Sequence, residues 1–276
     1  MYTKCVTFVT NGFFFESFPF IINFLSLVTR MYKLVLVIIT VVCFPCTVLS
    51  KMPSAIGVGI GWENAPYKRY KHQYYPMPYV NYDNGIGYLE NTEAGLYLFN
   101  EDHQNLTLSL NYLSNEFQPN DSKDSQLLQL TKRHPTLLAV LEYAFDTNIG
   151  SFSVNVGHDV LNQSQSLLVN LDYNAPLFGD QWILLFKIGV AWSNHRHNTY
   201  YYGVSDSESL RSGLKYYKAN SALTPNIAVT GQYLLAQSIG IFTGIKAEWL
   251  TGDIARSPLI ANKVVPSAYT GLFYSF

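Results

Sequence analysis

Cysteine, charge and long apolar runs are all scarce in most of this chain. The three cysteines are Cys5, Cys43 and Cys46, so no disulfide framework and no thiolate metal site can form beyond Lys51. Charged residues make up 13% of the 276 residues, about half the share of a typical soluble domain. The 18 Lys and Arg against 19 Asp and Glu leave no basic surplus, so no nucleic-acid partner is predicted.

Aromatic and hydrophobic side chains are what the sequence has in abundance. Aromatics reach 15% with 21 Tyr, 17 Phe and 4 Trp, and the hydrophobic share of 48% excludes a disordered chain. The mean hydropathy of only +0.06 gives little support for a bundle of membrane helices. An aromatic-rich surface with few charges predicts that something other than water contacts much of the protein.

The amino-terminal part of the chain has the features of a targeting segment. Lys33 is followed by an apolar stretch over 34–49 and by the small residue Ser50, which predicts a signal peptide over 31–50 and export from the cytoplasm. The alternative is an uncleaved membrane helix, but the apolar stretch is shorter than the roughly 20 residues that cross a bilayer.

Residues 1–30 fit a targeting segment less well. Their apolar stretch contains Glu16 and Pro19, so we interpret them as an upstream extension that precedes a true start at Met31. Lipid attachment is not predicted, because neither Cys43 nor Cys46 follows the Leu-small-small pattern that it requires.

After Lys51 the chain alternates between apolar and polar residues with a period of two. In 104–113, for example, Leu106, Leu108 and Leu110 alternate with polar residues, and four further segments repeat the pattern: 148–157, 164–174, 221–234 and 238–250. This alternation is typical of strands with one apolar and one polar face. A soluble sandwich hides the apolar faces inside, whereas an outer-membrane barrel turns them toward lipid.

The tryptophans favour the barrel. Trp182 and Trp192 share one face of a predicted strand, and ten residues at about 3.3 Å each with a tilt of roughly 40° span about 25 Å along the membrane normal. That is the height of the lipid-facing band between two aromatic girdles. We therefore predict a membrane girdle that contains Trp182, Trp192 and Trp249.

The connections alternate between short and long, as periplasmic turns and external loops do. The short ones are 146–148, 175–180 and 235–237, and the long ones are 114–135, 193–218 and 251–263. We predict an all-β fold, a transmembrane antiparallel up-and-down β-barrel that forms a single domain over 51–276. Twelve strands are expected at 55–62, 76–83, 85–90, 93–100, 104–113, 136–145, 148–157, 164–174, 181–192, 221–234, 238–250 and 265–276. If the short strand 85–90 merges with a neighbour, the count is ten.

The last strand ends on an aromatic residue. Gly271, Tyr274 and the terminal Phe276 resemble the carboxy-terminal insertion signal of outer-membrane barrels. The resemblance implies that the barrel-assembly machinery reads this strand during insertion.

Loop motifs link the chain to one barrel family. They are Ala65-Pro66-Tyr67 with Tyr70, Pro76-Met77-Pro78-Tyr79 with Asn81-Tyr82, Tyr200-Tyr201-Tyr202-Gly203-Val204-Ser205 with Glu208-Ser209, Arg211-Ser212-Gly213-Leu214, and Gly252-Asp253 with Ser257-Pro258. In this order they resemble the MltA-interacting protein (MipA)/OmpV family of the Gram-negative cell envelope. The resemblance extends from about Ile56 to the end of the chain.

The resemblance implies a function as well as a fold. It implies an outer-membrane scaffold that joins a lytic murein transglycosylase to a murein synthase, and hence a role in peptidoglycan metabolism. The rival prediction is a channel or uptake porin for small solutes. No enzyme activity is predicted.

The signature loop also has a physical interpretation of its own. Ser205 stands three residues before Glu208, which is the spacing of a capping box, and Gly213 can end the helix that follows. We expect Tyr200 to Tyr202 to lead from the barrel rim into this helix. The loop either packs over the barrel mouth for stability or forms a recognition surface.

Candidate chemistry is sparse. His195 and His197 have a spacing that could chelate a metal, but no third ligand is evident, and no motif links His158 and Asp159 to the serines of the signature loop. We interpret His158, Asp159 and these serines as solvated loop residues. The sequence therefore predicts no catalytic residue, no metal site and no cofactor.

Several charged residues fall on strand faces predicted to point inward. We expect Lys187, Lys246 and Glu248, with Asp172 and Glu142, either to form an ion-pair network in the lumen or to line a solute path. Outer-membrane lipids would surround the barrel. The basic cluster of Lys68, Arg69, Lys71 and His72 is either a solvated loop or a contact for lipopolysaccharide phosphates.

Overall fold

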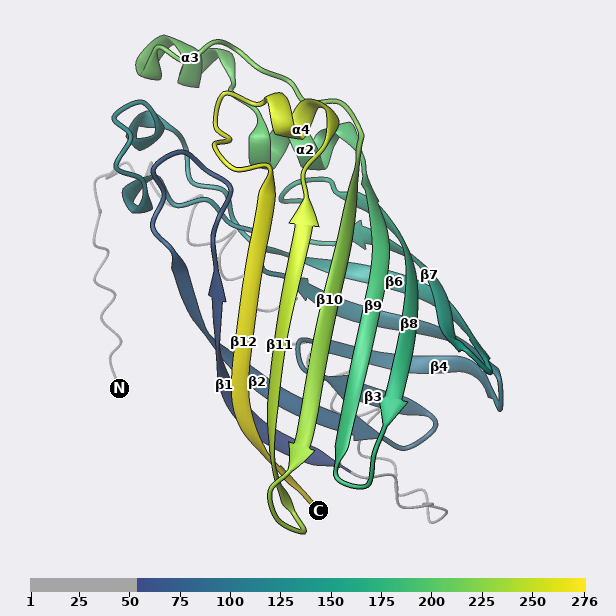
Figure 1. Ribbon diagram of the computed structural model, residues 1–276. Helices are drawn as coiled ribbons and strands as arrows, with labels where there is room; N and C mark the ends of the chain where they lie inside the picture. Colours follow the sequence, from purple (N-terminus) through teal and green to yellow (C-terminus); the bar gives the residue numbers. More distant parts are fainter. Residues whose placement is uncertain (1–53) are drawn as a thin grey trace, which may run out of the picture. The chain divides into compact units, whose positions relative to one another are not determined.

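Alternating side chains give each strand two chemically different faces, and a closed barrel separates the two faces completely. The computed structural model describes residues 54–276, which form a single closed barrel of antiparallel strands (Figure 1). The predicted signal peptide and the upstream extension lie outside the described residues. The part of the chain that is described has no helix long and apolar enough to cross a membrane.

The barrel has twelve strands, as the sequence predicts. They are β1 (Ala55–Glu63), β2 (Gln73–Asp83), β3 (Gly87–Glu90), β4 (Glu93–Glu101), β5 (Gln104–Leu113), β6 (Thr136–Thr147), β7 (Gly150–Asp159), β8 (Leu167–Phe178), β9 (Trp182–Ser193), β10 (Ala222–Leu234), β11 (Ile239–Trp249) and β12 (Val264–Ser275). Each strand pairs with its neighbours in sequence, and β1 pairs with β12 to close the cylinder. The ten-strand alternative is wrong, because β3 is short but remains a separate strand.

Two predicted turns are wrong in position. Strand β8 continues through Ala175 to Phe178, because residues 175–178 stay paired with β9, and the actual turn covers 179–181. Strand β6 similarly extends to Thr147, which is paired with Gly150 of β7. In both cases the hairpin pairing continues beyond the predicted start of the turn.

The outside of the barrel is apolar. On β1, for example, Ile56, Val58 and Ile60 are all exposed, whereas the alternate positions are glycines that face the lumen. Close approach explains these glycines: a Cβ on Gly61 would lie 2.3 Å from the ring of Tyr75, and one on Gly59 would lie 2.8 Å from the ring of Phe242. Glycines in the first strand therefore make room for lumen side chains.

The two ends of the barrel differ. One end has short turns at 84–86, 102–103, 148–149, 179–181 and 235–238. The other end has the loops 64–72, 114–135, 160–166, 194–221 and 250–263, and these contain η1 (Pro119–Asp121), η2 (Leu127–Gln129), α2 (His195–Tyr202), α3 (Asp206–Ser212) and α4 (Gly252–Arg256). Figure 1 shows these helices gathered above one end of the barrel.

Candidate functional sites in the loop cap, the lumen and the turn end

Four loops at one end of the barrel pack into a cap with its own hydrophobic core. We define the cap as the loops 64–72, 114–135, 194–221 and 250–263. Its buried apolar side chains come from all four loops and include Tyr67, Phe117, Leu127, Tyr201, Tyr202, Val204, Ile254 and Leu259. Tyr67 packs edge to face on Phe117 with ring centroids 4.8 Å apart. The motif residues of the signature loop therefore serve as packing residues of the cap.

Helix α2 corrects the expectation for Tyr200 to Tyr202. These tyrosines end a helix that begins at His195, and they do not lead from the rim into the next helix. The side chain of Asn194 caps this helix by accepting a hydrogen bond from the backbone N–H of His197 at 3.0 Å. The Tyr201 hydroxyl, buried in the cap, donates to the carbonyl of His134 at 2.9 Å. An N-cap Asn before His195 was the available sequence signal for this helix.

Helix α3 confirms the predicted capping box. The hydroxyl of Ser205 accepts from the backbone N–H of Glu208, and the Glu208 carboxylate accepts from the backbone N–H of Ser205 at 2.9 Å. Gly213 ends the helix with φ of 71°, a left-handed conformation that glycine adopts without strain. Arg211 and Ser212, the remaining signature residues, lie within this helix.

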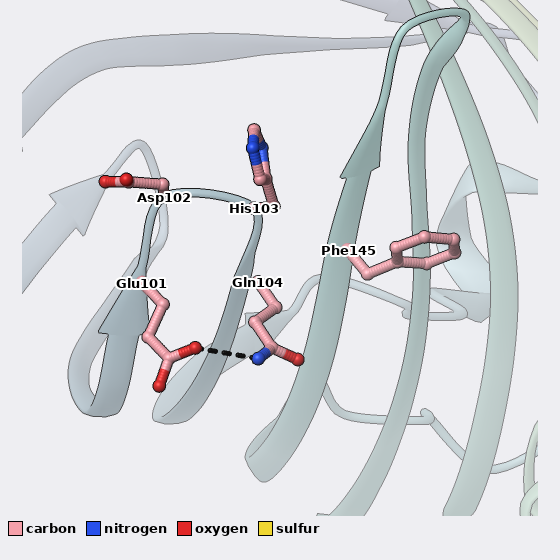
Figure 2. A pocket seen from close by; sticks show the side chains of 5 residues that line it. All are labelled: Glu101, Asp102, His103, Gln104 and Phe145. Atoms are coloured by element: carbon pink, nitrogen blue, oxygen red, sulfur yellow. Dashed lines mark hydrogen bonds between the residues drawn. The ribbon is translucent and has the colours of Figure 1, made fainter.

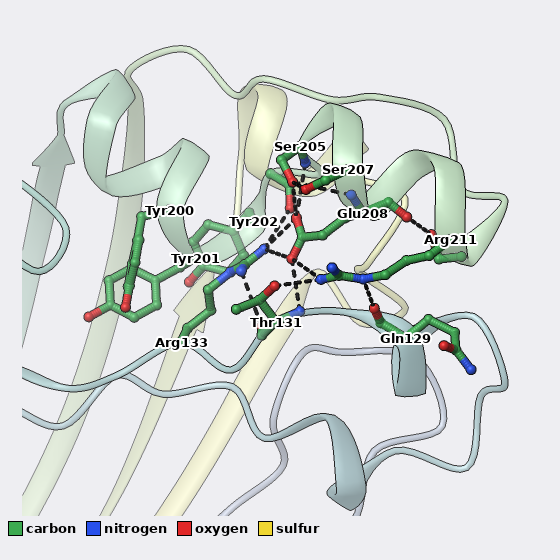
Figure 3. Close-up of polar contacts among 12 residues, drawn as sticks. Gln129, Thr131, Arg133, Tyr200, Tyr201, Tyr202, Ser205, Ser207, Glu208 and Arg211 are labelled. Carbon is green, nitrogen blue, oxygen red and sulfur yellow. Dashed lines mark hydrogen bonds and ion pairs between the residues drawn. The ribbon is translucent and has the colours of Figure 1, made fainter. Parts of the chain in front are cut away.

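A buried ion pair joins α3 to the loop 114–135 (Figure 3). Glu208 lies 2.8 Å from the guanidinium of Arg133, and its side chain is 2% exposed. The same carboxylate accepts a hydrogen bond from the backbone N–H of Thr131 at 2.9 Å. Burial alone would raise the pKa of Glu208, but the backbone hydrogen bonds from Ser205 and Thr131 and the charge of Arg133 outweigh burial and lower it.

A second buried polar chain lies under α2. His197 Nδ1 is 2.7 Å from the hydroxyl of Ser166, which is hydrogen-bonded to Ser164, which in turn donates to Asp159 at 3.1 Å. Burial lowers the pKa of His197 to about 4, against the opposing effect of Asp159. The expectation that Asp159 is solvated is wrong, because Asp159 is buried, as is His197. His158, on the opposite face of β7, is exposed.

The hydrogen-bonded groups from His197 to Asp159 are not accessible to a substrate. Ser164, Ser166 and His197 are each at most 5% exposed, so no substrate atom can approach a nucleophile there. Among residues 54–276 no group of three metal-ligating side chains comes together. The arrangement connects the loop 160–166 to α2 by hydrogen bonds, which gives it a packing role in the cap.

The surface of the cap contains a hollow. A cavity of about 390 Å³ lies between α2 and α3, and Arg133, Tyr200, Tyr216 and Lys218 are among its lining residues. The basic residues of the loop 64–72 lie elsewhere in the cap, where Lys71 forms an ion pair with Asp121 at 3.6 Å.

The predicted lumen charges form two separate ion pairs. Lys187 on β9 contacts Asp172 at 2.9 Å, and Lys246 on β11 contacts Glu248 at 2.7 Å. The expectation of one network on neighbouring strands is wrong, because β10 lies between β9 and β11. Glu142 is not part of either pair and accepts a hydrogen bond from Asn155 at 3.1 Å.

The opposite end of the barrel carries a shallow hollow that the sequence did not reveal. Its volume is about 530 Å³, and it lies beside the turn between β4 and β5 (Figure 2). The lining residues are Glu101, Asp102, His103, Gln104 and Phe145. The neighbouring turn between β6 and β7 exposes Ile149.

The remaining predicted residues lie on the strands where the sequence placed them. Trp182 and Trp192 are at the two ends of β9, and Trp249 is the last residue of β11. Gly271 and Tyr274 lie on β12, and the backbone N–H of Phe276 donates to the carbonyl of Ser54 at 3.0 Å. Their roles as girdle and insertion signal remain predictions.

Comparison with known proteins identifies the family of this chain. Residues 56–276 match the family model described as MltA-interacting protein MipA. The MltA-interacting protein of Escherichia coli strain K12 is 28% identical over 222 residues, which cover 80% of this chain and 90% of the relative. YiaT of the same strain is 27% identical over the same shares of the two chains. Among solved structures, the NanC porin has a TM-score of 0.46 at 10% identity, with 80% of this chain and 100% of the porin covered. The chain belongs to the MltA-interacting protein family and is an outer-membrane β-barrel.

Proposed function

We propose that this barrel anchors a murein transglycosylase to the outer membrane through its turn end, which faces the periplasm. The observation that carries the proposal is the contrast between the two ends. Most large apolar side chains of the cap pack into its own core, although Leu128, Leu210 and Tyr216 are exposed, whereas three of the short turns expose an apolar residue where turns are normally polar: Ile86, Ile149 and Leu235. The E. coli relative is named for its interaction with MltA, which supports a partner of this class.

The geometry limits how strong this contact is. Turns of two to four residues offer a small surface, below the roughly 1,200 Å² of a stable protein interface. The interaction is therefore weak, and several turns together contribute to it. The hollow lined by Glu101 and Asp102 adds a negatively charged recess beside the exposed Ile149, which favours a partner with basic and apolar residues. A murein synthase joins the same assembly as a second partner.

Crosslinking tests the anchor. We expect a murein transglycosylase to co-purify with the barrel after mild crosslinking in intact cells. The double variant Ile149→Asp with Asp102→Lys should reduce its recovery, because it changes both the apolar and the acidic parts of the turn end. The matched control, Leu210→Asp with Asp206→Lys, makes the same charge changes on the exposed surface of α3. Equal recovery from both variants would contradict the anchor.

The second candidate function is a channel for small solutes. It is favoured by the charged lumen side chains Lys187, Lys246 and Glu248. Purified barrel in a planar bilayer should show steady single-channel currents if this function is correct. Loss of those currents on Lys187→Met, with the fold retained, would assign the path to these residues.

Export by a signal peptide over 31–50 completes the proposal. Amino-terminal sequencing of the barrel recovered from outer membranes should show a start near Lys51. A start within residues 1–30 would contradict both the signal peptide and the upstream extension.

A further inference from the structure

The wall of the barrel is incomplete beside β2. This strand pairs with β1 from Gln73 to Asn81, but on its other side only residues 81–83 pair with β3. Among residues 54–276, no strand pairs with residues 73–79 on that side. The neighbouring β3–β4 hairpin is too short to reach further, because its turn at 91–92 lies level with Val80.

Two prolines account for this gap. The carbonyl of Val80 accepts a hydrogen bond from Asn91 at 2.8 Å, so the backbone groups of Val80 point toward the hairpin. Backbone groups alternate in direction along an antiparallel strand, so those of Pro78 and Pro76 point the same way. Proline has no N–H, and this edge of β2 therefore offers carbonyl acceptors but no donors at these positions. The pairing with β1, made through the alternate residues, is unaffected.

The gap has defined borders, and we call it the window. Its lower border is the β3–β4 turn, which is joined to β5 by the hydrogen bond from Tyr112 to Thr92 at 3.1 Å. Its upper border is the cap, where Lys71 donates to the carbonyl of Asp121 at 2.9 Å. The window thus occupies the half of the wall nearest the cap, which lies in the outer leaflet of the membrane.

Both sides of the window are accessible. Tyr74 points outward and is 67% exposed, while Tyr75 points into the lumen and is still 39% exposed. Backbone carbonyls without donors are costly in hydrocarbon, so they are stable there only beside protein, water or a ligand that donates hydrogen bonds. The chemistry of the edge therefore selects an occupant with donor groups.

An acidic cavity lies just inside the lower border. Its volume is about 470 Å³, and its lining contains four carboxylates and no Lys or Arg: Asp83, Glu90, Glu93 and Glu142. Glu93 accepts hydrogen bonds from Tyr88 and Asn111 at 2.6 Å, whereas Glu90 makes no ion pair with a described residue. The nearby Lys187 is already paired with Asp172.

Buried polar groups in the same place lack partners. Thr107 lines the cavity, is only 4% exposed, and its hydroxyl has no hydrogen-bond partner among the described residues. The side-chain oxygen of Asn91, in the turn that borders the window, also has none. Unpaired buried acceptors beside carboxylates favour a ligand that is cationic and donates several hydrogen bonds.

We infer that the window admits a single-chain amphiphile with a primary ammonium head group from the outer leaflet. The tail lies in the membrane against Tyr74, Pro76 and Pro78. The head group passes over the β3–β4 turn and donates hydrogen bonds to the free carbonyls and to Glu90. This lateral binding site rests on the orientation in the proposed function, with the turn end facing the periplasm, but it does not require the anchor itself, since it uses the opposite half of the barrel.

A cysteine in the lumen tests the inference. In the full chain with Cys5, Cys43 and Cys46 changed to Ser, Met77→Cys places a thiol on the lumen side of the window. Barrel in phosphatidylcholine vesicles is treated with N-ethylmaleimide, alone and with dodecylammonium, butylammonium or dodecanoate. We expect dodecylammonium to slow labelling of Met77→Cys, and the other two to have little effect. Ser267→Cys, on the lumen face of β12 where both edges are paired, should be unaffected by all three.

Each other outcome overturns the inference. Equal protection by butylammonium would mean that the head group binds from water without lateral entry. Equal protection by dodecanoate would mean that the acidic cavity has no selective effect, and no protection at all would mean that nothing enters. Glu90→Gln should weaken the protection about tenfold, as loss of a charge contact does, and heat-modifiable migration shows that the variant is folded.

Discussion

His197 is a single residue whose charge state controls part of the cap. Its pKa is about 4 in the folded protein, below the usual value near 6.5, because burial disfavours the imidazolium. The cap is therefore most stable above pH 6.5 and loses stability as the pH falls from there toward 4. The loss in the free energy of unfolding approaches about 3 kcal/mol, which corresponds to the difference between the folded and the usual pKa of His197.

Thermal unfolding of the cap, followed by near-ultraviolet circular dichroism of its tyrosines, measures this effect. The midpoint temperature of the wild-type protein should decrease as the pH is lowered from 7 to 4.5. His197→Gln cannot be protonated in this range, so its midpoint should depend much less on pH. Equal pH dependence of the two proteins would refute the assignment to His197.

Glu208 is the other residue on which the cap depends. Glu208→Gln leaves the guanidinium of Arg133 buried without its counter-charge, which typically costs about 3–5 kcal/mol. We expect faster trypsin cleavage within 194–221, a loop that contains Arg196, Arg211, Lys215 and Lys218. Glu116→Gln, an exposed change in the cap, should leave the cleavage rate unchanged. A normal rate for Glu208→Gln would show that the pair does not hold the cap closed.

At the scale of one strand, the prolines of β2 predict where substitutions are tolerated. Pro76 directs its backbone to the window, whereas Met77 directs its backbone N–H to β1. Met77→Pro should therefore break the ladder, at a cost of about 3 kcal/mol or more, and reduce the fraction of folded barrel. Pro76→Ala should fold normally. Heat-modifiable migration in electrophoresis distinguishes the two, and similar behaviour of both variants would contradict the edge assignment.

The elements differ in how well the sequence predicts them. Alternation is clear in five segments, since a wall with lipid on one face and a polar lumen on the other imposes it, whereas the short strand β3 left a choice between twelve and ten strands that the structure decides for twelve. Helix α2 was not predicted, because its buried face consists of His197 and Asn198 as well as Tyr201 and Tyr202, so it leaves no apolar stripe in the sequence. Pro76 and Pro78 were recognised as family motif residues. That they form an unpaired strand edge follows only from the short length of the neighbouring hairpin, which the sequence does not give.

The sites were less predictable than the strands for a related reason. The capping box is a local signal, so spacing alone revealed it. The partner of Glu208 lies 75 residues away in sequence, and the chain from His197 to Asp159 crosses two loops. Contacts of this kind depend on how the loops pack together, which periodicity does not encode.

At the scale of the whole molecule, the seam between β1 and β12 brings the ends of the described chain together. The hydrogen bond from Phe276 to Ser54 allows a circular permutant in which a short linker joins the two and new ends open at 102–103. We expect it to refold in detergent, because every strand keeps its neighbours. If Phe276 also acts as the insertion signal, the permutant should fail to insert in cells. Normal insertion would contradict that predicted signal.

The interruption beside β2 also has a mechanical consequence. A barrel resists radial deformation through the hydrogen bonds between its strands. On one side of β2 these hydrogen bonds are absent over residues 73–79. The outer half of the barrel is therefore more compliant at this point than around the rest of its circumference. We therefore expect lateral pressure from the surrounding lipids to change the width of the window before it deforms the rest of the wall.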